Sequence, residues 1–263
     1  IKQLEDQIGL ALFEQVGKKN HLTTAGRELW ATCREVFGSL ERFEMAAAQW
    51  QGLERGTLRL AAVSTAEYFL PHLLGPFCQR HPTIEVALEI TNRERLLTRL
   101  QENLDDLYVF GRPPDRLAVE AFAFLPNPLV VIAAHTDPLG AQQPLRLTQL
   151  AQAPFLIRES GSGTRLAVER LFARQQLKLN IRMELGSTEA IKQAVAAGLG
   201  ISVVSQHTLQ GGAQGLRVLQ AEGFPLRRSW YLAYPKGKRL SVVSSAFLAH
   251  LRTEGKTTLT PPA

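Results

Sequence analysis

Apolar residues near the start of the chain recur at alternating intervals of four and three positions. They are Leu29, Cys33, Val36, Leu40, Phe43, Ala47 and Trp50. This heptad spacing predicts a helix over residues 25–51, for which Thr23 and Thr24 are the N-cap candidates. Because the other faces of the helix are heavily charged, we expect this apolar seam to pair with a second copy of the chain. All seam residues except Ala47 are predicted dimer contacts; the alternative is an amphipathic helix that packs on its own domain.

Shorter elements come before this helix. Residues 1–7 have the pattern of a helix end, and Gly9 is its expected terminator. Two short strand candidates then flank a turn that contains Lys18, Lys19 and Asn20. A helix followed by a basic hairpin is how a winged helix-turn-helix contacts the DNA backbone, which makes the three turn residues candidate DNA contacts. The alternative is an ordinary surface hairpin.

From residue 57 onward, short apolar runs alternate with amphipathic segments. The runs predict strands at 58–63, 84–90, 107–110, 119–125, 129–134, 155–158, 181–185, 201–204 and 229–234. The amphipathic segments predict helices at 67–80, 93–103, 164–175, 188–197 and 240–251. Strands separated by helices of about a dozen residues indicate parallel α/β sheets. Two such sets joined by extended crossovers predict two lobes, with ligands in the cleft beyond the carboxyl ends of the strands.

Three of the predicted strands lead into helices through turns rich in hydroxyl groups and glycine. These turns contain Ser64, Thr65, Ser160, Gly161, Ser162, Gly163, Thr164, Ser187 and Thr188. Free N–H groups and the helix dipole favour an anion at such a place, and Arg112 and Arg165 are candidate countercharges. For any single turn, N-capping explains the hydroxyl as well. The occurrence of three such turns favours an anion-binding cleft.

Charge and composition change this interpretation only in part. The net charge of +6 suggests a polyanionic partner, but residues 1–56 hold seven Lys/Arg and eight Asp/Glu, so charge alone does not indicate DNA. The two cysteines make no disulfide framework and fit a cytoplasmic location. No apolar run is long enough to cross a bilayer, so we expect no membrane partner. The six histidines have no metal-ligand spacing, and no phosphate-binding lysine loop or nucleophile elbow occurs. We therefore expect neither an enzyme nor a bound metal or cofactor.

Several segments resemble LysR-type transcriptional regulators. Residues 1–9, followed by Leu-Phe-Glu at 12–14, resemble the end of that family's recognition helix and the turn after it. Leu-Thr-Thr-Ala-Gly at 22–26 resembles the entry into its dimerising linker helix. Gly-Leu-Gly-Ile at 198–201 resembles a helix-to-strand turn of the second regulatory lobe, and Phe-Leu at 247–248 also fits. The chain departs from many members at 107–112, where Asp-Leu-Ala-Ile is commoner.

This resemblance implies an α/β fold class with a partial winged helix-turn-helix, a long dimerising linker helix and a bilobal effector domain like a periplasmic binding protein. The implied divisions are 1–24 for the DNA-binding part, 25–56 for the linker helix and hinge, 57–126 plus 237–263 for lobe I, and 127–236 for lobe II. Lys2 then joins the candidate DNA contacts. The resemblance also implies that the first helices of the winged domain precede Ile1 in a longer protein.

Within the family, Gly-Arg-Pro-Pro at 111–114 and the run at 158–165 resemble regulators of CO2-fixation and RuBisCO operons. The expected effector is a small dicarboxylate or phosphorylated anion such as 2-oxoglutarate, 2-phosphoglycolate or ribulose bisphosphate. The expected partners are promoter DNA, further copies in a homodimer and homotetramer, and RNA polymerase. Two other classes stay open. A solute-binding protein shares the bilobal fold but has no use for the seam, and a bilobal transferase needs a convergent catalytic site.

Overall fold

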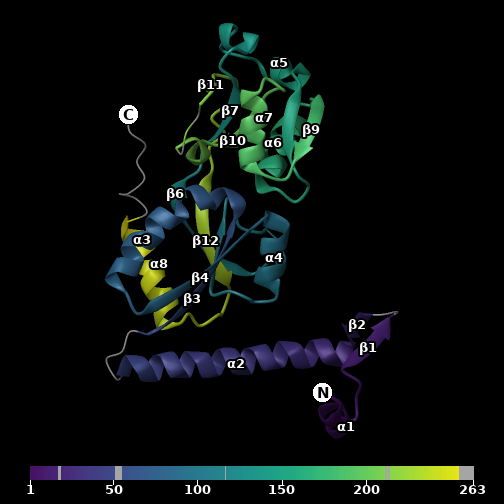
Figure 1. Cartoon of the computed structure of the whole chain (residues 1–263), viewed down its shortest axis with the longest axis vertical. Helices are drawn as coiled ribbons and strands as arrows, with labels where there is room; N and C mark the ends of the chain where they lie inside the picture. Colours follow the sequence, from purple (N-terminus) through teal and green to yellow (C-terminus); the bar gives the residue numbers. More distant parts are fainter. Residues whose placement is uncertain (17–18, 51–54, 116, 211, 213, 255–263) are drawn as a thin grey trace. The chain divides into compact units, whose positions relative to one another are not determined.

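The computed structural model describes residues 1–16, 19–50, 55–115, 117–210, 212 and 214–254. The chain forms two compact units, Ile1–Gly56 and Thr57–Ala263. The elements of both units are labelled in Figure 1. None of the described helices is both long enough and apolar enough to span a lipid bilayer.

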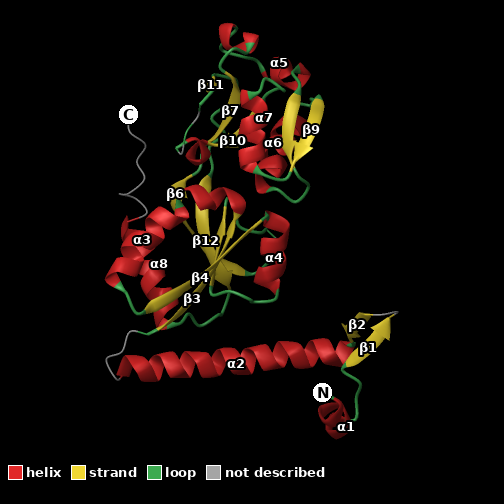
Figure 2. Cartoon of the chain, in the orientation of Figure 1, coloured by secondary structure: helices red, strands yellow, loops and turns green. Residues whose placement is uncertain are grey.

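The first unit consists of two helices and a hairpin. Its elements are α1 (Lys2–Ile8), β1 (Phe13–Val16), β2 (Lys19–Leu22) and α2 (Thr24–Trp50), with β1 and β2 antiparallel (Figure 2). Gly9 ends α1 with a φ of 74°, the left-handed conformation that glycine adopts most easily. Glu5 links α1 to the hairpin, since its Oε1 accepts from the backbone N–H of Leu12 at 2.7 Å. The predicted helix end, hairpin and long helix are therefore confirmed as local structures.

The start of α2 is fixed by a cap and by close packing. The hydroxyl of Thr23 accepts from the N–H of Gly26 at 3.0 Å, which satisfies one of the free donors of the first turn. A Cβ on Gly26 would lie 2.1 Å from the carbonyl oxygen of Leu12, so only glycine lets the helix approach the chain here. The packing of α2 on the hairpin thus depends on this glycine.

The first lobe of the second unit is built on a five-stranded sheet in the order β4-β3-β5-β12-β6. The strands are β3 (Gly56–Val63), β4 (Ile84–Thr91), β5 (Leu107–Phe110), β6 (Val119–Pro126) and β12 (Ser229–Pro235). β3 and β5 are parallel, whereas β12 runs antiparallel to both β5 and β6. The sheet is therefore mixed, and not purely parallel as the pattern predicts.

Helices cover this sheet. They are η1 (Ser64–Tyr68), α3 (Leu70–Arg80), α4 (Arg93–Gln101) and α8 (Val242–Glu254). α8 returns from the end of the chain to lie beside α3, where the Phe77 and Phe247 rings meet edge to face with centroids 5.0 Å apart (Figure 1). α3 and α8 lie on one side of the sheet and α4 on the other.

The second lobe contains two smaller sheets. One has the order β10-β7-β11 and consists of β7 (Leu129–Ala134), β10 (Ser202–Ser205) and β11 (Leu216–Leu219). The other pairs β8 (Phe155–Arg158) with β9 (Ile181–Leu185) in parallel. A bridge between Phe155 and Ile201 links the two sheets. The helical elements are η2 (Pro138–Ala141), α5 (Leu147–Gln152), α6 (Gly163–Arg174), α7 (Thr188–Ala196) and η3 (Gln206–Leu209).

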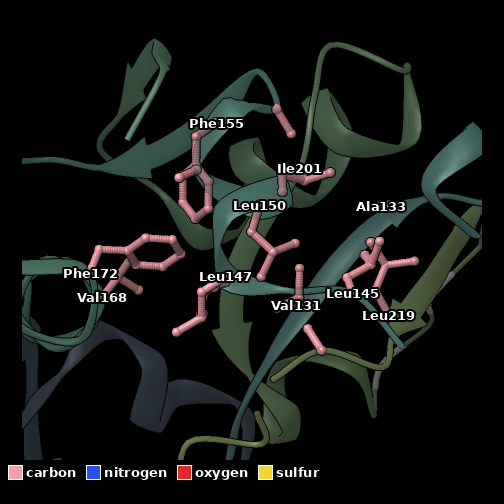
Figure 3. Packing of buried hydrophobic residues seen from close by; sticks show 14 of the residues in the cluster. Val131, Ala133, Leu145, Leu147, Leu150, Phe155, Val168, Phe172, Ile201 and Leu219 are labelled. Atoms are coloured by element: carbon pink, nitrogen blue, oxygen red, sulfur yellow. The ribbon is translucent and has the colours of Figure 1, made fainter. Parts of the chain in front are cut away.

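The interior of the second lobe holds two apolar clusters, and part of the larger one is shown in Figure 3. Phe155 of β8 and Phe172 of α6 pack edge to face, with centroids 6.2 Å apart. Leu150, Val131 and Ile201 complete the packing from a helix and two sheets. Each fully buried side chain of this size contributes roughly 1.5–3 kcal/mol, so this cluster fixes the lobe on which one wall of the candidate site is built.

The structure confirms most predicted elements and corrects three details. Strands at 107–110, 129–134, 155–158 and 181–185 match to the residue. The predicted helix at 67–80 is instead η1 followed by α3, with a break at Phe69. β11 and α5 were not predicted, because a four-residue strand and a six-residue helix leave little periodicity. β12 belongs to the sheet of lobe I, which contradicts its assignment to lobe II at 127–236.

Candidate anion-binding site

A narrow cleft with a cavity volume of about 20 Å³ lies between the two lobes of the second unit. It is lined by Val63, Ser64, Thr65, Asn92, Arg93, Gly111, Asn127, Arg158, Ser162, Gly163, Thr164, Arg228 and Trp230. Most of these residues lie where β3, β4, β5 and β8 end and where η1, α4 and α6 begin, while Asn127 follows β6, and Arg228 and Trp230 lie at the start of β12. The carboxyl ends of strands from both lobes therefore face one space, as the sequence predicts.

Arg158 connects the lobes at the end of β8. Its side chain is buried, and it donates to the hydroxyl of Thr188 at 2.5 Å and to the hydroxyl of Ser64, in the other lobe, at 3.1 Å. Glu159 neutralises the guanidinium through an ion pair of 2.7 Å. A buried charge needs such a partner. Arg158 thus orders the hydroxyls around the cleft.

Arg228 makes a second bridge between the lobes. It donates to the carbonyl oxygen of Gly163 at 3.2 Å and to that of Gly111 at 3.0 Å. Arg93 donates to the carbonyl oxygen of Arg112, and its guanidinium lies over the Phe110 ring, 5.5 Å from the centroid. In the part of the chain that the structure describes, no carboxylate forms an ion pair with Arg93 or Arg228.

The pKa values of these two arginines are lowered by burial and by neighbouring positive charges. Burial, followed by repulsion from the charges of Arg93 and Arg112, lowers the pKa of Arg228 to about 10. Burial also lowers the pKa of Arg93, followed by repulsion from Arg112 and Arg170. A group whose charged form is disfavoured in this way gains stability when an anion arrives. The cleft is therefore prepared for a negative ligand.

Trp230 supplies a neutral donor to the same space. The side chain is fully buried, and its Nε1 has no hydrogen-bond partner among the described residues. A buried N–H left unpaired costs roughly 1–3 kcal/mol. Because Trp230 lines the cleft, a ligand bound there could accept a hydrogen bond from this N–H. Asn127 is also buried there, where its Oδ1 accepts from the hydroxyl of Ser205 at 2.8 Å. Its amide nitrogen lies close to Gly111.

Five of the predicted site residues line the cleft: Ser64, Thr65, Ser162, Gly163 and Thr164. Ser162 is also the N-cap of α6, since its hydroxyl accepts from the N–H of Arg165 at 3.5 Å. Ser162 therefore both caps a helix and lines the cleft.

The other predicted residues lie outside the lining. The hydroxyl of Ser187 caps α7 through the N–H of Ala190 at 3.4 Å, while Thr188 reaches the cleft only through Arg158. The N–H of Ser160 donates to Glu184 at 3.4 Å, and Gly161, with a φ of 83°, packs closely on Glu94.

Of the two predicted countercharges, neither faces the cleft. Arg165 forms ion pairs with Glu169 at 2.7 Å and with Glu184 at 2.5 Å. Arg112 pairs with the exposed Asp115 at 3.0 Å. The arginines that do line the cleft are Arg93, Arg158 and Arg228.

Some of the missed residues carry a signal in the sequence, and others do not. Asn92 and Arg93 directly follow β4, Gly111 directly follows β5 and Arg158 ends β8, so the strand-end rule applied to every strand finds them. Arg228 and Trp230 precede or belong to the antiparallel β12, whose place depends on pairing across the whole chain. No local pattern marks them.

The seam predicted on α2 presents apolar groups to the outside of the first unit. The exposed fractions of Val36, Leu40 and Phe43 are 53%, 53% and 63%, and Leu29 and Cys33 are half-buried. The side chain of Trp50 lies outside the described residues. Large exposed apolar surface is typical of an interaction site, and the dimer contacts stay a prediction.

The candidate DNA contacts are described only in part. Lys2 and Asn20 are exposed. Lys18 lies outside the described residues, as does the side chain of Lys19, which begins β2. Their contact with DNA stays a prediction.

Residues 51–256 match the family of LysR substrate binding domains. The chain belongs to the LysR family. Its relatives include the HTH-type transcriptional activator CmpR of Synechocystis sp., which is 47% identical over 253 residues, covering 95% of this chain and 83% of that protein. The RuBisCO operon transcriptional regulator of Acidithiobacillus ferrooxidans is also 47% identical, over 95% of this chain and 82% of its own length. The resemblance to regulators of CO2 fixation is thus confirmed.

Two solved structures agree with the fold. The regulatory domain of Synechocystis CcmR, solved in complex with 2-PG, is 48% identical and has a TM-score of 0.74, covering 80% of this chain and all of that one. A full-length OxyR variant from Pseudomonas aeruginosa is 20% identical with a TM-score of 0.72, covering 96% of this chain and 86% of that one, and supports the fold alone. The effector domain therefore has the LysR bilobal α/β architecture.

Proposed function

We propose that this LysR protein is a DNA-binding transcriptional regulator of carbon-fixation genes, controlled by a small phosphorylated anion in the cleft between its lobes. The cleft supports this most directly. It brings together Arg93 and Arg228, which have no carboxylate partner among the described residues, and the Trp230 N–H, which has no acceptor there. The relatives are named as regulators and not as enzymes, which supports a regulatory role.

The chemistry of the cleft favours a phosphoryl or carboxylate ligand. Guanidinium groups, helix N-termini and hydroxyls of Ser64, Ser162 and Thr164 all interact with anionic oxygen. CcmR, at 48% identity, was solved with 2-PG, which is 2-phosphoglycolate. We infer that 2-phosphoglycolate is the first ligand to test, ahead of 2-oxoglutarate and ribulose bisphosphate.

The ligand acts by favouring one arrangement of the lobes. Arg158 and Arg228 both cross between lobes, so an anion that contacts them is sensitive to how far the lobes are closed. A ligand shifts a conformational equilibrium only by its difference in affinity for the two states. The closed state is therefore the one that the anion stabilises.

The remaining parts supply assembly and DNA binding. We infer that the seam of α2 pairs two copies in a homodimer, and that the effector domains assemble two dimers into a homotetramer. The hairpin and α1 belong to a winged helix-turn-helix that contacts promoter DNA through Lys2, Lys18, Lys19 and Asn20. Contact with RNA polymerase would follow from a role in activation.

Calorimetric titration of the full chain with 2-phosphoglycolate tests the site. The double variant Ser162→Ala with Thr164→Ala should lose about tenfold or more in affinity, because two hydroxyls at the start of α6 are removed. DNA binding without ligand should stay unchanged. The matched control is Thr98→Ala with Ser245→Ala, which removes two exposed hydroxyls elsewhere in the same unit. Equal affinity in the site variant and the control would show that the anion binds somewhere else.

A further inference from the structure

A second groove lies beside the cleft and shares part of its wall. Its cavity volume is about 150 Å³, and Arg93, Gly163 and Arg228 line both spaces. Arg112, Arg170 and Arg174 line only the groove. Among the residues that the structure describes, no acidic side chain is part of its lining.

One face of α6 builds one side of this groove. Gly163, Leu166, Ala167, Arg170, Leu171 and Arg174 follow one another at spacings of three, one, three, one and three. Residues at these spacings lie along a single helical stripe. Arg170 and Arg174 therefore stand one turn apart on the same face, and both are exposed.

The charge of the groove is poorly compensated within the protein. In the described part of the chain, Asp115 pairs with Arg112, whereas no ion pair is formed by Arg170 or Arg174. Like charges four residues apart on a helix destabilise it by about 0.2–0.5 kcal/mol. Repulsion from Arg112 and Arg170 also lowers the pKa of Arg93 and of Arg228. A bound anion would neutralise these arginines and remove the repulsion between them.

We propose that this groove is a second anion site, which takes an organic ligand with two or more phosphoryl groups while a smaller anion occupies the cleft. Each phosphoryl group carries about −1.5 to −2 charges near neutral pH, so several are needed to balance this many arginines. Leu166, Leu171 and Leu226 give the groove an apolar strip beside the guanidinium groups, which suits a carbon skeleton.

The shared wall makes the two sites distinct but coupled. Arg228 holds the carbonyl oxygens of Gly163 and Gly111, and Arg93 holds that of Arg112, so both guanidinium groups are fixed between the two spaces. An anion on one side reduces the repulsion that the other side experiences. The groove ligand therefore changes the affinity of the cleft ligand, and the reverse effect is equal in size.

Inorganic pyrophosphate is the probe, titrated into the full chain by calorimetry at fixed ionic strength, with and without saturating 2-phosphoglycolate. We expect one equivalent of pyrophosphate to bind in both cases. Arg170→Gln with Arg174→Gln should weaken pyrophosphate about tenfold or more and change 2-phosphoglycolate affinity by less than about threefold. The matched control, Arg95→Gln with Arg182→Gln, removes two exposed arginines outside the groove and should change neither.

Three results would overturn the proposal. One is the absence of pyrophosphate binding; another is displacement of pyrophosphate by 2-phosphoglycolate with no effect of the Arg170 and Arg174 substitutions. The third is loss of DNA affinity in that variant with pyrophosphate binding intact, which would assign these arginines to the DNA backbone. Pyrophosphate binding is measured without 2-phosphoglycolate as well, so failure of the cleft ligand leaves the groove tested separately.

Discussion

The seam of α2 exposes apolar side chains to water, whereas the cleft of the effector domain buries polar groups that lack full partners among the described residues. Along the seam, Leu40 and Phe43 expose more than half of their apolar side chains to solvent. In the cleft, Arg228 and Trp230 are polar groups taken away from water without full partners among the described residues. Apolar exposure is relieved by another apolar surface, whereas a buried donor or cation is relieved by an acceptor or an anion. One region therefore indicates a protein partner and the other a small ligand.

The largest expected effect is on the seam. Leu40→Asp places a charge in the predicted helix pair, and an unpaired charge in such an interface should weaken dimerisation about 100-fold or more. Analytical ultracentrifugation over a concentration series measures this. Ala31→Asp is the control, because Ala31 is exposed on the opposite face of the same helix. If both variants dimerise like the parent protein, the seam is not the interface.

The next effect is on ligand affinity, and it compares Arg228 in the cleft with Arg165, which is already paired with carboxylates. Arg228→Gln should reduce 2-phosphoglycolate affinity by about 30-fold, since a charge-assisted contact is lost. Arg165→Gln should change it less than about twofold, because that guanidinium is paired with Glu169 and Glu184. Calorimetry gives both values, and thermal unfolding shows whether each variant is folded. An unchanged affinity in Arg228→Gln would remove Arg228 from the site.

Trp230→Phe should have a smaller effect, which changes ligand affinity but not thermal stability. The variant loses the N–H that has no partner among the described residues, which offsets part of the cost of the smaller ring in the core. We expect little change in the thermal stability of the free protein and a loss of about tenfold in 2-phosphoglycolate affinity. Trp30→Phe, in the first unit, is the control. Unchanged affinity in Trp230→Phe would mean that the indole N–H does not contact the ligand.

The smallest effect concerns pH. The hydrogen bond from Lys192, at 2.8 Å, holds the pKa of Glu189 below its usual value, with help from Gln193 and Tyr68. A depressed carboxyl pKa contributes stability above the unfolded-state pKa, and this contribution disappears as the pH falls through the folded-state pKa. Glu189→Gln should therefore flatten the stability profile below about pH 4.5. Thermal unfolding between about pH 3 and pH 7 measures it, and identical slopes in both proteins would contradict it.

The sequence predicts the local elements better than their long-range pairing. Short strands such as Leu107–Phe110 and Phe155–Arg158 are visible because a buried strand is a bounded apolar run. β12 is visible as a strand, yet its partners β5 and β6 lie about a hundred residues earlier, and no local pattern encodes that choice.

The same distinction applies to the site. Ser64, Ser162 and Thr164 follow from the rule that ligands gather at strand ends. The sequence indicates that a countercharge is needed but not which arginine supplies it. Arg165 and Arg158 are equivalent candidates in the sequence, and both form ion pairs with glutamates. They differ because Arg158 lines the cleft, whereas Arg165 pairs with Glu184 on β9 and lies outside the lining. Trp230 enters the cleft because β12 crosses back to the first sheet.

The central claim is that an anion completes the cleft by accepting the N–H of Trp230. The most direct measurement follows the three indole N–H resonances of the full chain by NMR during a titration with 2-phosphoglycolate, with Trp230→Phe used for assignment. The account predicts that the Trp230 resonance moves downfield and saturates at one equivalent, while those of Trp30 and Trp50 do not follow the same curve. Saturable binding with an unmoved Trp230 resonance would contradict it.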